Sequence, residues 1–371
     1  MKFLFACGGT AGHVNPAIAI ADELKKAIPG SEFLFVGAGR EIENRIIPQA
    51  GYEVKNITIS GFSRSLSLDG LKKNLKMVKN LSVAGKESAE IINSFKPDAV
   101  IGTGGYVCYP VLKTARKKGI PTVMHESNAV PGLTAKMLSG IVNKMLVAFP
   151  DTEKQYKKPE NVVYTGTPIR GSFSELSKEE AKEKLGISNK KLVVSFWGSL
   201  GASKMNAMMD DFISLNSNEG SFFHIHATGG GDSGKEKMVG RLEDKNVAVK
   251  NTDIRPYIDD MGTVMTAADV ILCRSGASTL AEISALGRPS VLVPSPYVTN
   301  NHQEKNARAV EREGGAIVLC EEECTGKKLY EAVISILSDE SKAIKMAKCS
   351  EKLGVKDATE KIRNIIVDLI H

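Results

Sequence analysis

A histidine directly follows a cluster of small residues near the start of the chain, Gly8-Gly-Thr-Ala-Gly-His13. Glycines between a strand and a helix let the backbone adopt positive φ and approach a phosphate. Histidine titrates near neutral pH, so on the rim of such a loop it can act as a general base. Taken alone, the loop can equally be structural, and a lone histidine here is more often a helix-capping group than a base.

This loop differs from two familiar phosphate loops. It has neither the Gly-x-Gly-x-x-Gly pattern of dinucleotide-binding domains nor the Gly-Lys-Ser/Thr of a P-loop. A nicotinamide-binding domain also needs an acidic residue at the end of its second strand, for the ribose. Here that strand ends in Phe35-Val-Gly-Ala-Gly39, and the first acid after it is Glu41. The sequence therefore disfavours a dehydrogenase.

A second group of chemically useful residues lies in Cys273-Arg-Ser-Gly-Ala-Ser-Thr-Leu-Ala-Glu282. The pattern predicts a strand, a Ser-Gly turn and then a helix, whose first backbone N–H groups can bind a diphosphate. Glu282, two turns into that helix, could accept hydrogen bonds from ribose hydroxyls. A plain strand-to-helix turn with a solvated glutamate is the alternative. The polar loop Pro294–Ala307 favours binding, because it follows another strand as a sugar-binding loop would.

The elements that must position these groups alternate along the chain. Apolar, β-rich runs in the first half predict buried parallel strands over Phe3–Ala6, Glu32–Val36, Ala99–Ile101, Thr122–Met124 and Lys144–Val147. Helical patterns cover Pro16–Ala27, which Asn15 is placed to cap, and Leu71–Ser94. The second half restarts with strands over Lys191–Phe196, Phe222–Ala227, Val247–Lys250, Val270–Leu272, Ser290–Val293 and Ala316–Val318. Each half predicts a doubly wound α/β domain.

Two such domains suit the length of 371 residues, which exceeds what one ordinary core supports. We expect an N-terminal domain over residues 1–166 and a C-terminal domain over residues 167–354. The boundary falls in the Gly/Pro-containing segment Thr165–Arg170. The apolar spacing of Thr359–Ile370 predicts a final helix, and we expect residues 355–371 to pack back on the N-terminal domain.

Composition is that of a soluble globular protein, with 25% charged and 42% hydrophobic residues. We expect no signal peptide, because the apolar run after Met1-Lys2 is short and ends at glycines. We also expect no membrane span, because the uncharged run Ala99–Leu112 has 14 residues and a span needs roughly 20. The six cysteines form no Cys-x-x-Cys pair and are expected to be reduced thiols in the cytosol. The net charge of +6 allows an acidic partner without requiring one.

Six motifs in order along the chain resemble the MurG family of UDP-N-acetylglucosamine transferases. They are Gly8-Gly-Thr-Ala-Gly-His13, His125-Glu-Ser-Asn128, Thr165-Gly-Thr-Pro-Ile-Arg170, Gly198-Ser-Leu-Gly-Ala202, Arg274-Ser-Gly-Ala277 and Asn301-His-Gln303. The resemblance implies the GT-B fold, with two Rossmann-like domains facing across a cleft. It also implies inverting transfer of N-acetylglucosamine from UDP to the muramyl 4-hydroxyl of lipid I, which gives lipid II for cell-wall synthesis, cell shape and division.

The same resemblance assigns roles to residues. His13 would act on the acceptor side, as the base or as the group that orients the acceptor. Glu282 would bind the ribose, the Ile258 backbone would meet the uracil, and Gln303 and Asn128 would bind the N-acetylglucosamine. The other implied donor contacts are Thr10, Ala11, Gly12, Arg170, Ser199, Ala277, Ser278, Thr279, Leu280 and Ala281. The chain has no Asp-x-Asp motif to hold a metal under the diphosphate, so we expect no metal and no other cofactor.

A second glycine turn, Gly102-Thr-Gly-Gly-Tyr106, follows a predicted strand. The resemblance places Gly104, Gly105 and Tyr106 at the diphosphate of the acceptor. A tight strand-to-helix turn explains the same residues equally well.

A basic amphipathic stretch lies between Gly61 and Lys86, where six cations accompany one acid. Its apolar residues recur at helical spacing among lysines, which suits an anionic membrane surface. The residues of this membrane-binding prediction are Leu71, Lys72, Leu75, Lys76, Val78 and Lys79. A solvated helix that packs its apolar stripe on the core is the alternative, and a lipid-linked acceptor favours the membrane.

Together these patterns predict a peripheral enzyme on the cytoplasmic face of the bacterial cell membrane. Its expected partners are UDP-N-acetylglucosamine, lipid I and the anionic membrane surface, without nucleic acid. One alternative is another UDP-sugar transferase of the same fold, acting on diacylglycerol or a natural product. A non-catalytic nucleotide-sugar-binding subunit is a further alternative, and it would release no UDP when given lipid I.

Overall fold

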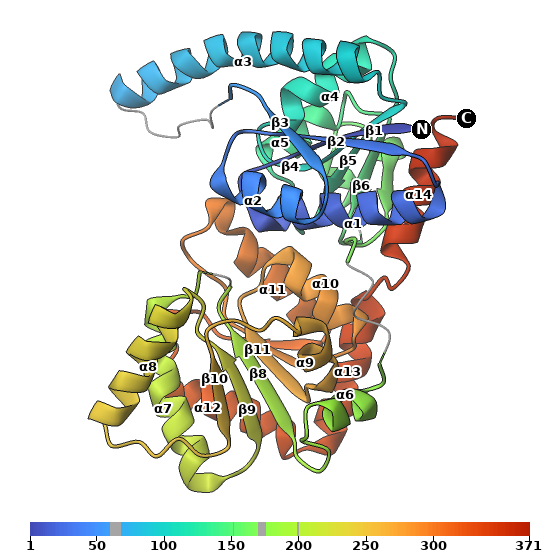
Figure 1. Ribbon diagram of the computed structural model, residues 1–371. Coiled ribbons are helices and arrows are strands. Elements are labelled where there is room, and N and C mark those ends of the chain that lie inside the picture. Colours follow the sequence, from blue (N-terminus) through green and yellow to red (C-terminus); the bar gives the residue numbers. More distant parts are fainter. Residues whose placement is uncertain (60–67, 151, 170–175, 199) are drawn as a thin grey trace. The chain divides into compact units, whose positions relative to one another are not determined.

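The computed structural model describes residues 1–371 other than 60–67, 151, 170–175 and 199, and for residues 68–79 and 299 it describes the backbone alone. The chain forms two compact units. One comprises Met1–Ile169 and Asp357–His371, and the other comprises Arg170–Lys356. Each unit contains one parallel sheet covered by helices on both faces (Figure 1). The doubly wound α/β class predicted from the alternating pattern is confirmed.

The first unit is built on a seven-stranded sheet with the order β3-β2-β1-β4-β5-β6-β7. Its strands are β1 (Lys2–Cys7), β2 (Glu32–Gly37), β3 (Glu53–Asn56), β4 (Ala99–Gly104), β5 (Thr122–Glu126), β6 (Lys144–Val147) and β7 (Val162–Tyr164). Strand order reverses where β1 lies beside β4. Ligands of doubly wound sheets bind outside the carboxyl ends of the strands at such a reversal. The two glycine turns leave the sheet there, after β1 and at the end of β4.

Helices cover both faces of this sheet because alternate strand residues point to opposite sides. The helices are α1 (Ala11–Ala27), α2 (Glu41–Gln49), α3 (Leu68–Phe95), α4 (Cys108–Lys117), α5 (Leu133–Leu138) and α14 (Ala358–Asp368). Leu4 and Ala6 of β1 belong to the core shared with α3, α4 and α5. Phe3 and Phe5 belong to the opposite core, shared with α1, α2 and α14.

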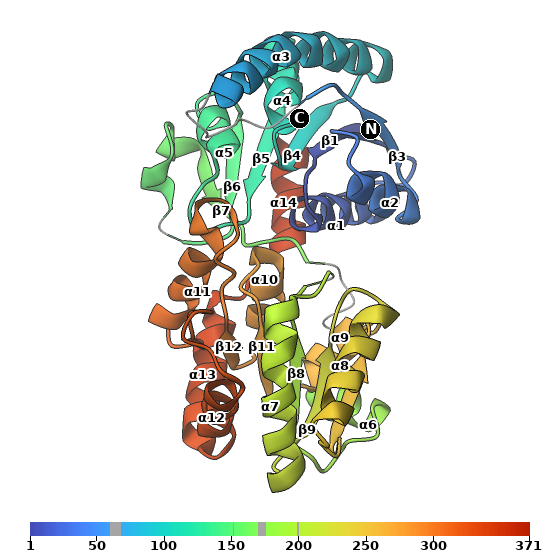
Figure 2. The ribbon, with the colours of Figure 1, turned by 90° about the vertical axis from the view of Figure 1, so that its left-hand side faces the viewer.

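The last helix of the chain belongs to the first unit. In both Figure 1 and Figure 2, α14 lies beside α1. Ile362 and Ile366 are fully buried in the same core as Phe3. Arg363 adds an ion pair with Glu23 on α1, with 2.5 Å between Nη1 and Oε1. The core of the N-terminal unit is therefore completed by residues from the far end of the sequence.

The second unit is built on a six-stranded sheet with the order β10-β9-β8-β11-β12-β13. Its strands are β8 (Leu192–Phe196), β9 (Phe223–Ala227), β10 (Thr252–Arg255), β11 (Val270–Cys273), β12 (Ser290–Leu292) and β13 (Ala316–Val318). Its helices are α6 (Lys178–Lys184), α7 (Ser203–Glu219), α8 (Asp232–Asp244), α9 (Met261–Ala267), α10 (Ala277–Ala285), α11 (His302–Arg312), α12 (Gly326–Leu337) and α13 (Glu340–Leu353). Valines and leucines of β8, β11 and β12 form one core with α7, α8 and α12.

Two local predictions are wrong. The first helix begins at Ala11, not after Asn15, because Thr10 is extended and its carbonyl accepts from His13 N at 3.1 Å. Pro16 therefore lies inside the helix, and His13 lies in its first turn. The predicted strand over Val247–Lys250 is instead a connection. Val247 N donates to Leu242 O at 2.9 Å to close the end of α8, and the strand follows as β10.

Among the residues that the structure describes, no helix is both long enough and apolar enough to cross a membrane.

Candidate active site

The two glycine turns of the N-terminal unit are in direct contact where β1 lies beside β4. The Gly8 N–H donates to the Gly104 carbonyl at 3.1 Å. Gly105 has φ +91°, and a Cβ placed on it would lie 2.4 Å from Gly8 O. The absence of a side chain at position 105 therefore allows the second turn to lie against the first.

His13 is held between these turns. Its Nδ1 lies 2.7 Å from the Gly8 carbonyl oxygen, and its own carbonyl accepts from Thr103 Oγ1 at 2.6 Å. A carbonyl can only accept, so Nδ1 carries a proton, and in the neutral ring the lone pair is then on Nε2. The ring also lies against Gly104, where a Cβ would be 2.3 Å from His13 Cδ2. This geometry suits a general base, whose acceptor nitrogen must be unprotonated.

The other predicted residues of this unit lie at the same sheet edge. Thr10, Ala11 and Gly12 form the start of the helix that carries His13. Tyr106 follows the second turn and is 46% exposed. Asn128 comes just after β5, the neighbour of β4 in the sheet.

Two buried glutamates at this edge were not predicted. Glu126, at the end of β5, accepts from the Asn128 backbone at 3.0 Å and from its side-chain amide at 2.9 Å. Glu43, on α2, is fully buried and accepts from the Gly9 N–H at 2.6 Å. One feature of the sequence points to Glu126, which is its place between two polar residues of the motif His125-Glu-Ser-Asn128. The sequence around Glu43 holds no such feature, because an acid in the first turn of a helix is ordinarily solvated.

In the second unit the predicted diphosphate site is the start of α10. Gly276 is the N-cap, and within the described residues no side chain caps this helix. The Ser278 hydroxyl is buried without a hydrogen-bond partner among the residues described. The backbone N–H groups of the first turn, including those of Ala277 and Thr279, point out of the N-terminal end of the helix. Anions bind favourably at that end. The side chain of Leu280 is buried in the unit, so only its backbone is available to a ligand.

Glu282 lies further along α10, beside Ala281, and is half-buried. Burial raises the pKa of its carboxyl to about 7. No hydrogen bond or ion pair engages this carboxyl within the described part of the chain. Ile258, the predicted uracil contact, has a side chain that is only 1% exposed, so a ligand could reach only its backbone.

Gln303, in the first turn of α11, joins the turn before α10 to the polar loop after β12. Its side-chain oxygen accepts from Ser295 N at 2.9 Å, and its carbonyl accepts from Ser275 Oγ at 2.8 Å. Arg274 supports the same turn through an ion pair with the buried Glu321, at 2.5 Å between Nη2 and Oε2. The structure thus brings Gln303 and the start of α10 together.

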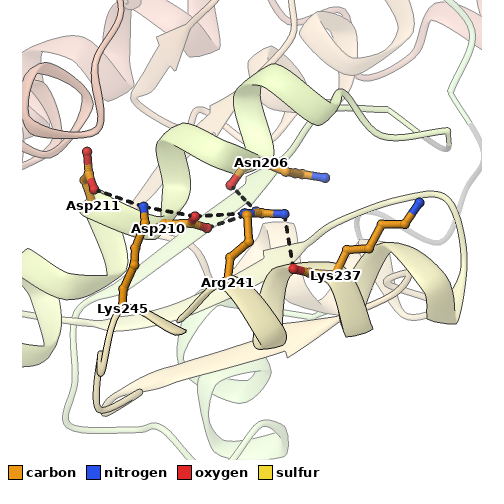
Figure 3. Close-up of polar contacts among 6 residues, drawn as sticks. All are labelled: Asn206, Asp210, Asp211, Lys237, Arg241 and Lys245. Carbon is orange, nitrogen blue, oxygen red and sulfur yellow. Dashed lines mark hydrogen bonds and ion pairs between the residues drawn. The ribbon is translucent and has the colours of Figure 1, made fainter. Parts of the chain in front are cut away.

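A partly buried ion pair supports the third glycine turn, which contains Gly198 and Gly201. Figure 3 shows Arg241 of α8 donating to both oxygens of Asp210 on α7, at 2.9 Å each, and to the Asn206 carbonyl at 3.1 Å. The Asn206 side chain donates in turn to Thr228 O at 2.8 Å. That oxygen would lie 2.2 Å from a Cβ on Gly201, which has φ +72°. The pair therefore fixes the strand-end loop on which the glycine turn rests.

We expect Asp210→Asn to lower the free energy of unfolding of the second unit by about 1.5–3 kcal/mol, the usual worth of hydrogen bonds to a charged group. The side chain of Arg241 is 35% exposed, so its charge can reach water, which keeps the loss below that for a fully buried pair. Urea unfolding followed by the fluorescence of Trp197 measures this, because it is the only tryptophan and lies in this unit.

Asp211→Asn is the matched control, since that neighbouring side chain is 68% exposed and should cost less than about 0.5 kcal/mol. Equal losses in the two variants would show that the ion pair does not stabilise the unit.

Several predicted residues lie outside what the structure describes. Arg170 and Ser199 are among the undescribed residues. For the membrane-binding prediction only the backbone is described, as part of α3; its residues are Leu71, Lys72, Leu75, Lys76, Val78 and Lys79. Over the described ranges, no three His, Cys, Asp or Glu side chains are grouped to hold a metal ion.

Comparison with known proteins gives one consistent family. The glycosyltransferase family 28 N-terminal domain matches residues 3–147, and the family 28 C-terminal domain matches residues 192–362. The chain is 45% identical to the UDP-N-acetylglucosamine–N-acetylmuramyl-(pentapeptide) pyrophosphoryl-undecaprenol N-acetylglucosamine transferase of Acetivibrio thermocellus, over 100% of this chain and 98% of that one. It is 46% identical to the protein of the same name from Thermoanaerobacter sp., over 99% of each. The crystal structure of Acinetobacter baumannii MurG is 25% identical, with a TM-score of 0.75 over 99% of both chains.

Proposed function

Because the chain belongs to glycosyltransferase family 28, we propose that it transfers N-acetylglucosamine from UDP to the lipid-linked N-acetylmuramyl pentapeptide of peptidoglycan synthesis. Membership of the family supports this class of reaction, because the relatives match over 98–99% of their own length. The structural observation that supports the chemistry is the hydrogen bond from His13 Nδ1 to Gly8 O. In the neutral ring it leaves the lone pair on Nε2, which can then accept a proton.

The transfer we propose is a single displacement with inversion. Nε2 of His13 takes the proton of the muramyl 4-hydroxyl as its oxygen attacks the anomeric carbon of N-acetylglucosamine. The bond from that carbon to the diphosphate breaks, and the electron pair leaves with UDP. The proton stays on His13 until solvent removes it.

We assign the donor to the second unit. The uncapped start of α10 supplies backbone N–H groups for the diphosphate, and the buried Ser278 hydroxyl supplies a further donor. The carboxylate of Glu282 accepts from the ribose hydroxyls. Gln303 contributes its amide nitrogen to the sugar, since its oxygen is bound to Ser295. Leaving-group stabilisation of this kind needs no metal.

We assign the acceptor to the N-terminal unit. The turn with Gly104 and Gly105 lies against the loop that holds His13, so an acceptor diphosphate bound at this turn would bring its sugar to the base. Asn128, held by Glu126, is the proposed contact to the N-acetylglucosamine from this unit.

The test is an assay of the purified chain with UDP-N-acetylglucosamine and a short-chain lipid I analogue, with and without chelator. We expect UDP release matched by disaccharide product, unchanged by chelator. Diacylglycerol as the preferred acceptor, or UDP binding without turnover, would overturn the proposed reaction. Activity lost with chelator and restored by Mg²⁺ would overturn its metal independence.

We also propose that the enzyme is peripheral on the cytoplasmic face of the cell membrane and serves cell-wall growth, shape and division. The lysine-rich sequence at the start of α3 supports this, because each Lys near an anionic surface is worth about 1 kcal/mol. Exchange of Lys72, Lys73, Lys76 and Lys79 for Glu should therefore abolish co-sedimentation with phosphatidylglycerol vesicles. Turnover on a water-soluble acceptor should persist.

The matched control exchanges four lysines of the second unit for Glu: Lys235, Lys237, Lys345 and Lys348. Vesicle binding by this control should be unchanged, and high salt should mimic the first variant. If the first variant still sediments with vesicles, the membrane contact lies elsewhere.

A further inference from the structure

Glu43 is a fully buried carboxylate beside the candidate base. Its Oε2 accepts from Ala38 N at 2.7 Å and from Arg40 N at 3.1 Å. Its Oε1 accepts from the Gly9 N–H at 2.6 Å. Burial of a charged group is costly unless hydrogen bonds replace its water, and these three donors provide them. The bond from Ala38 N ties α2 to the residue after β2, the bond from Arg40 N caps α2 itself, and the third bond reaches across to the loop after β1.

The Gly9 N–H and the Gly8 carbonyl belong to one peptide unit. On one side that unit donates to Glu43, and on the other its carbonyl accepts from Nδ1 of His13 at 2.7 Å. A hydrogen bond to a negative acceptor polarises the peptide and makes its carbonyl a stronger acceptor, because bonds in a chain reinforce one another. Carboxylate, peptide and imidazole thus form a continuous hydrogen-bonded chain.

We propose that Glu43 is a positioning residue that acts on His13 through the Gly8–Gly9 peptide. The carboxylate holds the peptide in one orientation, and the polarised carbonyl keeps the ring proton on Nδ1. In hydrolase triads a carboxylate does this by direct contact with the imidazole, and its loss places the proton on the wrong nitrogen. Here a peptide unit stands between the two groups. The inference rests on the proposed function, in which Nε2 of His13 takes the acceptor proton.

The space around the carboxylate fits this role. A Cβ on Gly8 would lie 2.6 Å from Glu43 Oε1, and a Cβ on Gly37 would lie 2.6 Å from Oε2. The carboxylate therefore occupies room that only glycines at these two positions leave open. Glu43 also completes the capping box of α2 by accepting from Arg40 N through Oε2. That bond leaves the second contact, between Oε1 and the Gly9 N–H, unexplained by helix formation.

The test compares Glu43→Gln, Glu43→Asp and the control Glu41→Gln, whose side chain lies in the same helical turn and is exposed. Nitrogen-15 NMR of the histidine rings reads the tautomer of His13 in its neutral form. We expect the Nδ1–H form in the unaltered protein and in Glu41→Gln, and a shift toward Nε2–H in Glu43→Gln. Turnover of Glu43→Gln should fall by at least about tenfold, with KM for the donor changed less than about twofold.

Glu43→Asp keeps the charge and should recover part of the turnover and of the Nδ1–H population. The inference is overturned if a folded Glu43→Gln protein keeps the original tautomer, or if Asp restores neither quantity. If Glu43→Gln does not fold, the tautomer of His13 in the unaltered protein decides. A proton on Nε2 overturns the inference, and a proton on Nδ1 supports it. Absence of N-acetylglucosamine transfer by the unaltered protein would refute the proposed function, whereas the tautomer measurement would be unaffected.

Discussion

Replacement of His13 by Ala should lower turnover by at least about 100-fold, because general-base assistance contributes on the order of 10²–10⁴-fold. The ring is held by Gly8 O and by contact with Gly104, and alanine places no titratable group there. UDP affinity should stay the same, since we assign the donor to the other unit. Steady-state kinetics with the lipid I analogue and calorimetric titration with UDP measure the two quantities.

His371→Ala is the control, because that histidine is exposed at the end of the chain and should leave turnover within about twofold of the original. Near-normal turnover of His13→Ala would remove His13 from the chemistry. A parallel loss of UDP affinity would instead place the loop at the donor.

Replacement of Glu282 by Ala should weaken UDP binding by about 10- to 100-fold, which corresponds to the 1.5–3 kcal/mol of a hydrogen bond to a charged group. The carboxyl has no partner among the described residues, so its removal costs binding and leaves no protein group unpaired. Calorimetry with UDP measures the loss, and an unchanged dissociation constant would exclude Glu282 from the site.

The pH dependence gives an independent check on Glu282. Burial raises the pKa of its carboxyl to about 7, so the free protein carries the proton below that pH and the carboxylate above it. Only the carboxylate accepts with both oxygens, so UDP affinity should fall as pH drops below 7, by up to about tenfold per unit. Glu282→Gln cannot titrate and should lack this step. Dividing the dissociation constant of Glu282→Gln by that of the unaltered protein at each pH cancels the titration of UDP itself. A ratio that does not change with pH would contradict the assignment of Glu282 to the UDP site.

Much of this fold could be predicted because its strands are buried on both faces. The run Phe3–Ala6 is apolar throughout and Lys144–Val147 is apolar after its first residue, as is typical of parallel strands covered by helices. The structure places β1 and β6 there. The glycine turns could also be predicted from the sequence, because only glycine allows residue 105 to lie so close to Gly8. The family resemblance was confirmed by relatives that match over the whole chain.

The errors arose where contacts distant in sequence decide the local structure. Asn15 and Pro16 form a good helix start on local grounds, but the loop after β1 lets the helix begin earlier, at Ala11. Val247–Lys250 has the composition of a strand, but the preceding helix closes onto Val247 and leaves no room for pairing. Glu43 and Glu126 were missed for the same reason, because their partners come together only in the folded unit. The assigned roles of the site residues remain predictions.

Because α14 packs in the N-terminal unit, it decides which unit can finish folding first during synthesis. Residues 1–169 leave the ribosome first, but the core around Phe3 still lacks Ile362 and Ile366. The second unit, Arg170–Lys356, is complete in sequence while that gap persists, so it can reach its final packing before its predecessor. The core of the N-terminal unit closes only when Ala358–Asp368 has been synthesised. Translation that stops before α14 would leave a finished second unit joined to an unfinished N-terminal unit, in which the apolar residues that α14 covers are exposed to chaperones and proteases.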